Sequence, residues 1–317
     1  MECTMKLLLS LLLLSSSAFA ASVPVTLDVG GAAVYGTELT PDGVQGKLPV
    51  VLLHAGSGPT DRDGNNHLLP GPNDSLKLLA EGLARHGIAS VRYDKRGIAA
   101  SANPRWREQE LRFDDYIADA AAWAARLRTD ARFSRVILIG HSEGAQIVAE
   151  ACAIAKADGC VLLAGAGHPA DELLREQLAK QLPPPLLAEN ERILAALKQG
   201  QPVADVPAPL QALYHASVQP YLISWLQHDP RKAVAGLSMP VLIVQGTSDV
   251  QVPVSEAQAL AAAAPRARLQ IIDGMNHLLK MVGTDAELQR KSYGSPDLPV
   301  APQLLDSVNS FIDQLAR

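Results

Sequence analysis

The sequence lacks several features that would assign the chain to a specialised class of protein. It has 28 Lys and Arg against 33 Asp and Glu, so no excess of positive charge is available for a nucleic-acid partner. It contains no run of like charges, no internal repeat and no low-complexity tract. Of its 317 residues 48% are hydrophobic, which is an ordinary globular composition with enough apolar material for one sizeable core.

Common metal and phosphate motifs are also missing. The sequence has no His-Glu-x-x-His, no paired cysteine motif and no glycine-rich phosphate loop followed by Lys. We therefore expect no metal and no cofactor.

The amino-terminal apolar run is too short to cross a membrane, which takes about 20 residues. Residues 7–14 are leucines apart from Ser10, follow Lys6 and lead to the small-residue segment 18–21. A basic start, a short apolar run and an A-x-A site are typical of a secretory signal, here cleaved after Ala20. We therefore expect no stable membrane anchor and an exported protein, periplasmic or secreted.

Only three cysteines are present, and Cys3 lies in the segment that we expect to be removed. In an oxidising compartment, Cys152 and Cys160 either form a disulfide or remain buried thiols that pack as small hydrophobic side chains. Both alternatives stay open, because the sequence does not show whether the two Cα atoms approach closely enough.

Apolar runs and helical periodicities alternate along most of the chain. Residues 23–34 alternate loosely and indicate an opening antiparallel segment, with turn signals near Pro41. Continuous apolar runs, typical of strands buried on both faces, then alternate with amphipathic stretches. The predicted strands are 48–54, 88–93, 135–139, 160–164, 241–245 and 268–272, and the predicted helices are 74–85, 112–128, one after 144, 254–264 and 301–315. This order predicts an α/β fold with a mostly parallel sheet covered on both faces.

One segment interrupts the alternation after the sixth strand. Residues 165–237 hold three consecutive prolines, several helical stretches and no convincing strand. We interpret the segment as a helical lid over the carboxyl edge of the sheet, where such folds bind ligands. The predicted organisation is a signal at 1–20, a first core part at 21–166, the lid at 167–237 and a second core part at 238–317.

The sharpest local motif is G-x-S-x-G at residues 140–144, between a predicted buried strand and a predicted helix. The two glycines permit a tight turn that lifts Ser142 to the edge of the sheet with its hydroxyl exposed. The following helix begins with the Glu143 N–H, which can help to bind an oxyanion. We therefore predict Ser142 as a nucleophile.

A serine nucleophile needs a base, and the base needs a group that orients it. Asp249 follows one predicted strand, and His277 follows the next, so both fall at the edge where Ser142 stands. The order Ser, acid, His is the one expected after a nucleophile elbow. Asp273 is the alternative acid, but it shares a short loop with His277 and is poorly placed to reach around the ring.

The loop after the first buried strand is rich in small residues. Its backbone can approach a substrate carbonyl, and either Gly56 or Ser57 is expected to supply a second oxyanion donor. Further along, Asp61, Arg62 and Asp63 are expected to hold the loop by ion pairs and hydrogen bonds, and residues 93–97 are expected to brace it.

At these motifs the chain resembles the α/β-hydrolase superfamily, and more narrowly the bacterial serine esterases grouped with serine aminopeptidase-like hydrolases and acylglycerol lipases. The segments that carry the resemblance are 55–65, 93–97, 140–144, 246–253 and 274–277. They span nearly the whole mature chain. The resemblance implies the α/β-hydrolase fold, a Ser142–His277–Asp249 triad and hydrolysis of short-chain esters. The usual His-Gly pair of the oxyanion loop reads His54-Ala55 here.

Several functions compete. The first is a carboxylesterase acting on a small-molecule ester, with the lid residues Tyr214, Tyr221 and Trp225 lining an acyl pocket. The second is an aminopeptidase-like serine peptidase or a thioesterase. A peptidase would need a lid carboxylate for an α-ammonium group, and the candidates are Asp171, Glu172, Glu176, Glu189 and Glu191. The third is a non-catalytic binding protein on the same fold. The sequence leaves the oligomeric state open.

Overall fold

The computed structural model describes residues 20–69 and 71–315. The expected signal at 1–20 therefore lies outside the described residues, apart from Ala20, and Cys3 lies outside them too. One sheet runs through the described part in the order β1-β2-β4-β3-β5-β6-β7-β8. Its strands are β1 (Ala21–Val29), β2 (Ala32–Thr40), β3 (Leu48–His54), β4 (Ala89–Tyr93), β5 (Phe133–His141), β6 (Gly159–Leu163), β7 (Val241–Gly246) and β8 (Arg268–Ile272).

The sheet is mostly parallel, as predicted. The β1–β2 and β2–β4 pairs are antiparallel, and the pairs from β4 through β3, β5, β6 and β7 to β8 are parallel. The central strands are nearly continuous apolar runs because both of their faces are covered. Parallel strands end at the same edge, so the loops after β3, β5, β7 and β8 lie close together.

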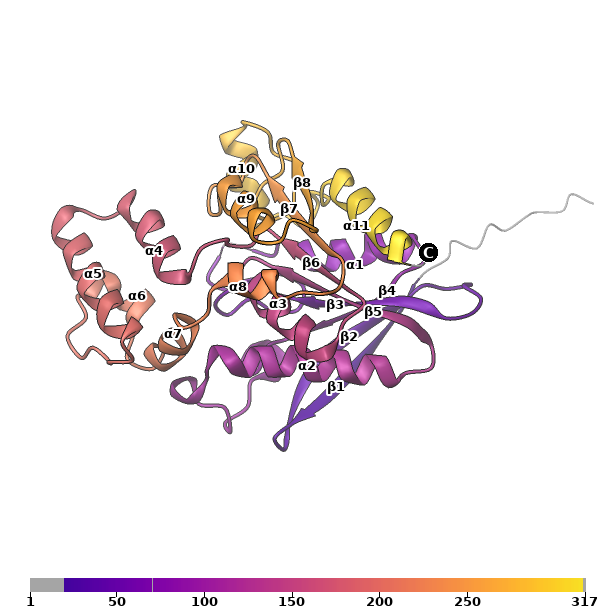
Figure 1. Ribbon diagram of the computed structural model, residues 1–317, viewed down its shortest axis with the longest axis horizontal. Helices are drawn as coiled ribbons and strands as arrows, with labels where there is room; N and C mark the ends of the chain where they lie inside the picture. Colours follow the sequence, from indigo (N-terminus) through magenta and orange to yellow (C-terminus); the bar gives the residue numbers. More distant parts are fainter. Residues whose placement is uncertain (1–19, 70, 316–317) are drawn as a thin grey trace, which may run out of the picture.

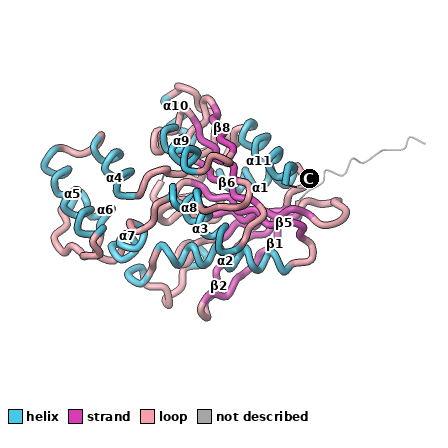
Figure 2. Tube along the Cα trace, in the orientation of Figure 1, coloured by secondary structure: helices cyan, strands magenta, loops and turns pink. Residues whose placement is uncertain are grey.

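Helices cover both faces of the sheet (Figures 1 and 2). On one face pack α1 (Ser75–Arg85) and α11 (Pro302–Leu315). On the other pack α2 (Phe113–Thr129), α3 (Glu143–Ala155), α8 (Pro230–Ala235) and α9 (Val254–Ala263). In α11 the buried apolar side chains recur at helical spacing and form one stripe toward the sheet: Leu304, Val308, Phe311 and Ile312.

The lid follows β6 and lies at the left of Figure 1. Its helices are α4 (Ala170–Ala179), α5 (Pro184–Lys198), α6 (Gln211–Tyr214) and α7 (Gln219–Trp225). They enclose a hydrophobic cluster of their own, which includes Ile193, Leu194, Leu197, Leu210 and Leu222. The predicted fold class, a mostly parallel α/β sheet with helices on both faces and a helical insertion after the sixth strand, is confirmed.

The opening segment is antiparallel, as predicted. It is a hairpin of two strands, and Gly30 and Gly31 form its turn with φ of 59° and 81°. Positive φ is easy for glycine, and the Gly-Gly pair was the signal for this turn. A short helix, α10 (Ala286–Ser292), follows the loop after β8 and was not predicted.

The two remaining cysteines lie on α3 and β6. Cys152 and Cys160 are free and buried, so the structure has the second of the two expected alternatives and no disulfide between them. Burial raises the pKa of the Cys152 thiol, which keeps it protonated and suits a hydrophobic packing role.

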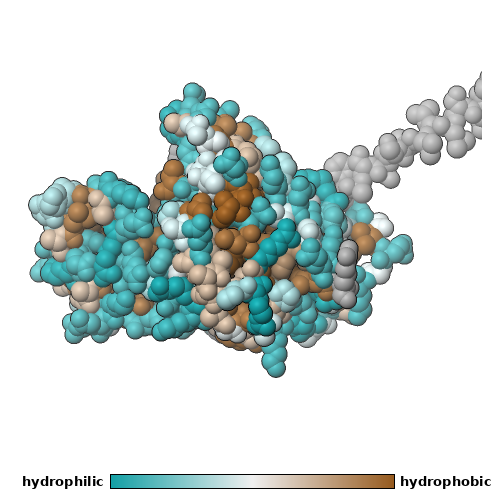
Figure 3. Space-filling model, turned by 45° about the horizontal axis from the view of Figure 1, so that its top comes forward, coloured by the Kyte–Doolittle hydropathy of each residue, from teal (hydrophilic) through white to brown (hydrophobic). Residues whose placement is uncertain are grey.

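Figure 3 shows a largely hydrophilic lid surface, with hydrophobic residues gathered over the middle of the molecule. Within the described ranges, no helix combines the length and the apolar character needed to cross a membrane.

Candidate active site

Ser142 stands on a sharp turn between β5 and α3. Its backbone has φ 58° and ψ −123°, a conformation that a residue with a Cβ rarely adopts. The flanking glycines make the turn possible. A Cβ on Gly140 would lie 2.0 Å from the carbonyl oxygen of Gly144, and a Cβ on Gly144 would lie 2.5 Å from that of Ala55. The predicted tight turn is therefore present, and it carries Ser142.

The structure brings Ser142, His277 and Asp249 together. His277 Nε2 lies 3.1 Å from Ser142 Oγ, and His277 Nδ1 lies 2.8 Å from Asp249 Oδ2. The His277 side chain is 5% exposed, and the Asp249 side chain is fully buried. The three residues follow β5, β8 and β7, so the shared edge of the parallel strands explains their convergence.

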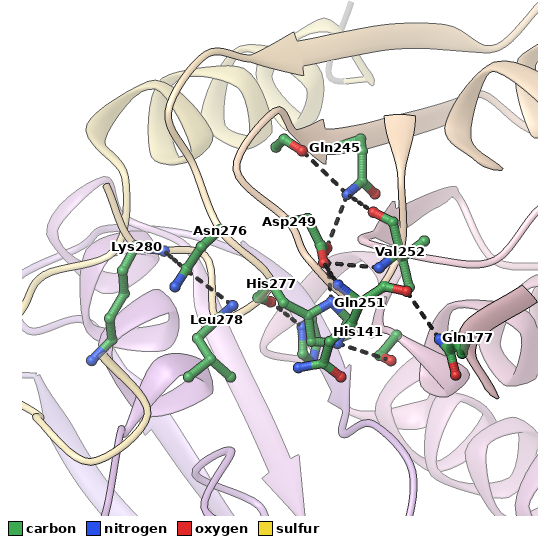
Figure 4. Close-up of polar contacts among 12 residues, drawn as sticks. His141, Gln177, Gln245, Asp249, Gln251, Val252, Asn276, His277, Leu278 and Lys280 are labelled. Atoms are coloured by element: carbon green, nitrogen blue, oxygen red, sulfur yellow. Dashed lines mark hydrogen bonds and ion pairs between the residues drawn. The ribbon is translucent and has the colours of Figure 1, made fainter. Parts of the chain in front are cut away.

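Four donors surround the Asp249 carboxylate (Figure 4). The backbone N–H groups of Gln251 and Val252 donate to Oδ1, whereas Gln245 Nε2 and His277 Nδ1 donate to Oδ2. Burial alone would raise the pKa of Asp249, but His277 and the backbone donors hold it below its usual range. The anion therefore fixes the imidazole with its proton on Nδ1 and its lone pair on Nε2 toward Ser142.

The backbone of His277 is held as well. His141 Nε2 donates to the His277 carbonyl oxygen at 2.7 Å. Burial, reinforced by the neighbouring His277, lowers the pKa of His141 to about 4, so its imidazole is neutral at pH 7. Asn276 Oδ1 accepts the N–H groups of Leu278 and Lys280 and shapes the same loop. The elbow motif contains His141 but does not reveal this role, because the partner of His141 is 136 positions away.

The candidate oxyanion donors flank the serine. Glu143 is the first residue of α3, and its N–H is one of those with no acceptor inside the helix. Gly56 is buried against the elbow, and a Cβ there would lie 3.2 Å from Ser142 Cβ. Ser57 is exposed at the start of the next turn. Glu143 and Gly56 thus lie beside Ser142, and Ser57 follows Gly56 in the chain.

The acidic and basic residues after this loop brace it, as expected. Arg62 forms an ion pair with Asp94 at 2.7 Å, and Arg92 forms one with Asp63 at 2.9 Å. Asp61 Oδ1 accepts the N–H groups of Asp63 and Asn65. The loop after β3 is therefore tied to β4 and to the segment that follows it.

The lid aromatics divide into two groups. Tyr221 donates to Glu143 Oε1 at 2.8 Å, and Trp225 Nε1 donates to Gln146 Oε1 at 2.9 Å, so both contact the first turns of α3. Tyr214 does not join them. Its side chain is fully buried in the lid cluster and its hydroxyl donates to Asn190. The structure therefore does not place Tyr214 at the site, because the lid has its own core to fill.

Asp273, the alternative acid, forms its hydrogen bond with a residue other than His277. Asp273 is exposed and accepts a hydrogen bond from Thr247 Oγ1 at 2.8 Å. Among residues 20–69 and 71–315, no group of three or more His, Cys, Asp or Glu side chains could hold a metal ion.

Known proteins resemble the chain in sequence and in fold. Esterase EstD of Thermotoga maritima is 31% identical over 258 residues, which cover 76% of this chain and 59% of EstD. The chain thus spans about three fifths of that relative. Est1E from Butyrivibrio proteoclasticus superposes with a TM-score of 0.59 at 15% identity, over 92% of this chain and 98% of Est1E. Dienelactone hydrolase from Anabaena variabilis superposes with a TM-score of 0.55 at 16% identity, over 93% and 98%.

The family model described as "Serine aminopeptidase, S33" matches residues 73–281, which is more than half of the chain. These residues extend from the start of α1 past His277. They include the elbow with Ser142, the lid, Asp249 and His277. The two solved folds agree with the family in the architecture of the sheet. The chain belongs to the serine aminopeptidase, S33, family of α/β hydrolases.

Proposed function

We propose that this chain is a serine hydrolase that cleaves short-chain carboxylic esters through an acyl-enzyme intermediate. The observation that carries the proposal is the continuous hydrogen-bonded series from Ser142 Oγ through His277 to Asp249 at the edge of the sheet. The similarity to an esterase supports an ester as the small-molecule substrate.

In the first half-reaction, Ser142 Oγ attacks the ester carbonyl carbon and His277 Nε2 accepts the hydroxyl proton. The buried Asp249 anion stabilises the imidazolium that forms. Backbone N–H groups of Glu143 and of Gly56 or Ser57 stabilise the negative oxygen of the tetrahedral intermediate. Collapse of the intermediate expels the alcohol, which takes its proton from His277, and leaves an acyl group on Ser142.

In the second half-reaction, water replaces the alcohol. His277 Nε2 accepts a proton from this water, and the resulting hydroxide attacks the acyl carbon. The second tetrahedral intermediate uses the same N–H donors. Its collapse releases the carboxylic acid and returns the proton to Ser142 Oγ, so one water is consumed for each ester bond.

An aminopeptidase is the less favoured alternative. It would need a free lid carboxylate for the α-ammonium group of a peptide. Four of the five candidates form ion pairs with lid cations at 2.7–3.0 Å: Asp171, Glu176, Glu189 and Glu191. Their charge is compensated within the lid, which favours the esterase proposal.

Hydrolysis of p-nitrophenyl acetate, butyrate and octanoate by the wild-type protein and by Ser142→Ala tests the proposal. We expect the variant to lose at least about a thousandfold in kcat, because the nucleophile is removed. Ser238→Ala, an exposed serine outside the site, is the matched control and should match the wild type. Equal activity of Ser142→Ala and wild type would show that another residue is the nucleophile. Activity on aminoacyl-p-nitroanilides alone would favour the peptidase.

We also propose that the protein is exported to the periplasm or secreted, with cleavage after Ala20. The support is the three-part pattern of residues 6–21. Mass spectrometry of the protein recovered from the periplasmic fraction and the medium should give a chain that begins at Ala21. An uncleaved chain found only in the cytoplasm would contradict export.

A further inference from the structure

A lysine is buried beneath the candidate oxyanion loop. Lys95 follows β4, and its side chain is 1% exposed. Its Nζ donates to the carbonyl oxygen of Gly56 and, at 3.0 Å, to that of Gly58. The ammonium also lies 5.5 Å from the centre of the Tyr116 ring. In the part of the chain that the structure describes, no carboxylate comes within ion-pair distance of it.

Such a lysine costs free energy of folding. Burial of an ammonium group without a paired anion is unfavourable, and lysines are seldom fully buried unless they are paired. Burial lowers the pKa of Lys95, and the charge of the buried Glu143 opposes this shift only in part. An apolar side chain of similar length would fill the space without the desolvation cost. The reason for a buried lysine at this position must therefore lie in the contacts that it makes.

Those contacts hold the backbone that borders the nucleophile. A Cβ on Gly56 would lie 3.2 Å from Ser142 Cβ, so the loop is in direct contact with the elbow. The Gly56 carbonyl and the Ser57 N–H belong to one planar trans peptide and point in opposite directions. With its carbonyl held by Lys95, this peptide directs the Ser57 N–H away from the core. Within the described residues that N–H donates to no backbone or side-chain acceptor.

We propose that Lys95 is a positioning residue for the oxyanion hole. It binds the carbonyl oxygens of Gly56 and Gly58, the two glycines that flank Ser57. It thereby fixes the Gly56–Ser57 backbone with its N–H groups toward the oxygen that becomes negative. Within the described residues, Lys95 donates to the loop and forms no hydrogen bond with Ser142, His277 or Asp249. The inference rests on the serine-hydrolase function proposed above.

The test compares Lys95→Met with Lys95→Gln, which is uncharged but keeps an N–H donor. The readouts are kcat and KM on p-nitrophenyl butyrate, and the rate at which an alkyl fluorophosphonate modifies Ser142. In that modification Oγ displaces fluoride at phosphorus, and the phosphoryl oxygen occupies the oxyanion position. We expect Lys95→Met to lower kcat and the modification rate about 10- to 100-fold, with KM within about threefold, because oxyanion donors act mainly in the transition state. Lys95→Gln should recover part of both rates.

Gln219→Met is the matched control for loss of a buried side chain that donates to two backbone carbonyls. Gln219 lies in the lid and is 1% exposed, and its Nε2 donates to the carbonyl oxygens of Val203 and Tyr214. We expect this variant to lower the melting temperature and to keep the modification rate within about threefold. If Lys95→Met does not fold, Lys95→Gln decides by the same readouts, with a loss of about tenfold expected.

The outcomes separate the two proposals. A wild-type protein that neither hydrolyses esters nor reacts with the fluorophosphonate overturns the serine-hydrolase function and the role of Lys95 with it. A wild type that reacts, beside folded Lys95 variants with unchanged kcat and modification rate, overturns the role of Lys95 alone. A Lys95 variant that loses only thermal stability overturns it in the same way.

Discussion

At the residue scale, the Asp249 carboxylate controls the protonation of the site. Its two oxygens accept four hydrogen bonds, so the side chain has little freedom to rotate. Because His277 and the backbone donors keep the pKa of Asp249 below its usual range, the carboxylate is charged at neutral pH. The proton of the neutral imidazole then stays on Nδ1, and Nε2 is free to act as a base.

We expect Asp249→Asn to lower kcat by about four orders of magnitude with little change in KM. The amide would donate to Nδ1 and favour the wrong imidazole tautomer, while the shape of the site is preserved. Steady-state kinetics on p-nitrophenyl butyrate measure both constants. Asp273→Asn is the control, since this exposed carboxylate bonds to Thr247 and not to His277. A larger loss in the Asp273 variant would make Asp273 the orienting acid.

At the scale of elements, α7 joins the lid to α3, the helix that follows Ser142. Tyr221 and Trp225 donate to Glu143 and Gln146 on α3, and the Trp225 ring stacks on Phe113 of α2 at a centroid distance of 5.8 Å. Glu143 is buried, and burial raises the pKa of its carboxyl group. The Tyr221 hydroxyl is therefore a partner of a group that has little access to water.

Tyr221→Phe should lower the free energy of unfolding by about 1–3 kcal/mol, the usual cost of leaving a buried polar group without its partner. Urea denaturation gives this value. Tyr35→Phe is the control, because Tyr35 is 42% exposed on β2, and its loss of a hydroxyl should change stability by less than about 0.5 kcal/mol. Equal effects of the two substitutions would show that the Tyr221–Glu143 contact contributes nothing.

The carboxyl side of the lid is held by a charged contact. His228, between α7 and α8, lies 2.8 Å from Glu150 on α3 and 3.3 Å from Asp114 on α2. The hydrogen bond to Glu150 raises the pKa of His228 against the opposing effect of burial. A raised histidine pKa stabilises the docked segment fully below the unfolded value of about 6.5, and this contribution is lost as pH rises through the folded value.

Amide hydrogen exchange in α7 and α8 of the wild type should therefore become faster as pH rises from about 6 to 8. This increase should be larger than the increase in Glu150→Gln. The substitution removes the main partner of His228, so the variant should show a smaller change over the same range. The comparison needs correction for the intrinsic pH dependence of exchange. An identical pH response in the two proteins would contradict an electrostatic contribution of His228 to lid docking.

At the scale of the whole molecule, the described residues form three hydrophobic clusters: one on each face of the sheet and one inside the lid. The loops that follow the strands join these layers. Lys280, in the loop after β8, donates to the carbonyls of Asn73 and Ser295 and so links this loop to two distant segments. Burial lowers the pKa of Lys280 to about 8, although Asp74 and Asp297 oppose the shift.

The stability of the protein should consequently depend on pH in the alkaline range. Between about pH 8 and 10.4 the unfolded chain binds the Lys280 proton more strongly than the folded chain does. Across this window, the free energy of unfolding of the wild type should rise with pH relative to that of Lys280→Met. Urea denaturation of both proteins at pH 7.5, 8.5 and 9.5 measures the difference. A difference that stays constant with pH would show that the pKa of Lys280 is not lowered.

Much of this architecture is encoded in local patterns. Continuous apolar runs predict the central strands, and the two glycines at 140 and 144 predict the elbow, because each pattern acts over a few neighbouring residues. The positions of Asp249 and His277 also follow from the sequence. Both come directly after strands, and parallel strands end at one edge of the sheet.

Other features depend on contacts between residues that are far apart in the chain, and only the tertiary structure shows them. Nothing local in the sequence distinguishes Tyr214, which packs inside the lid, from Tyr221, which reaches Glu143. The same holds for His141, which holds the backbone of His277, and for Lys95, whose partners lie 37 and 39 positions away. A pattern of apolar residues predicts which side chains are buried. The partner of a buried polar group, in contrast, depends on how the loops pack against one another.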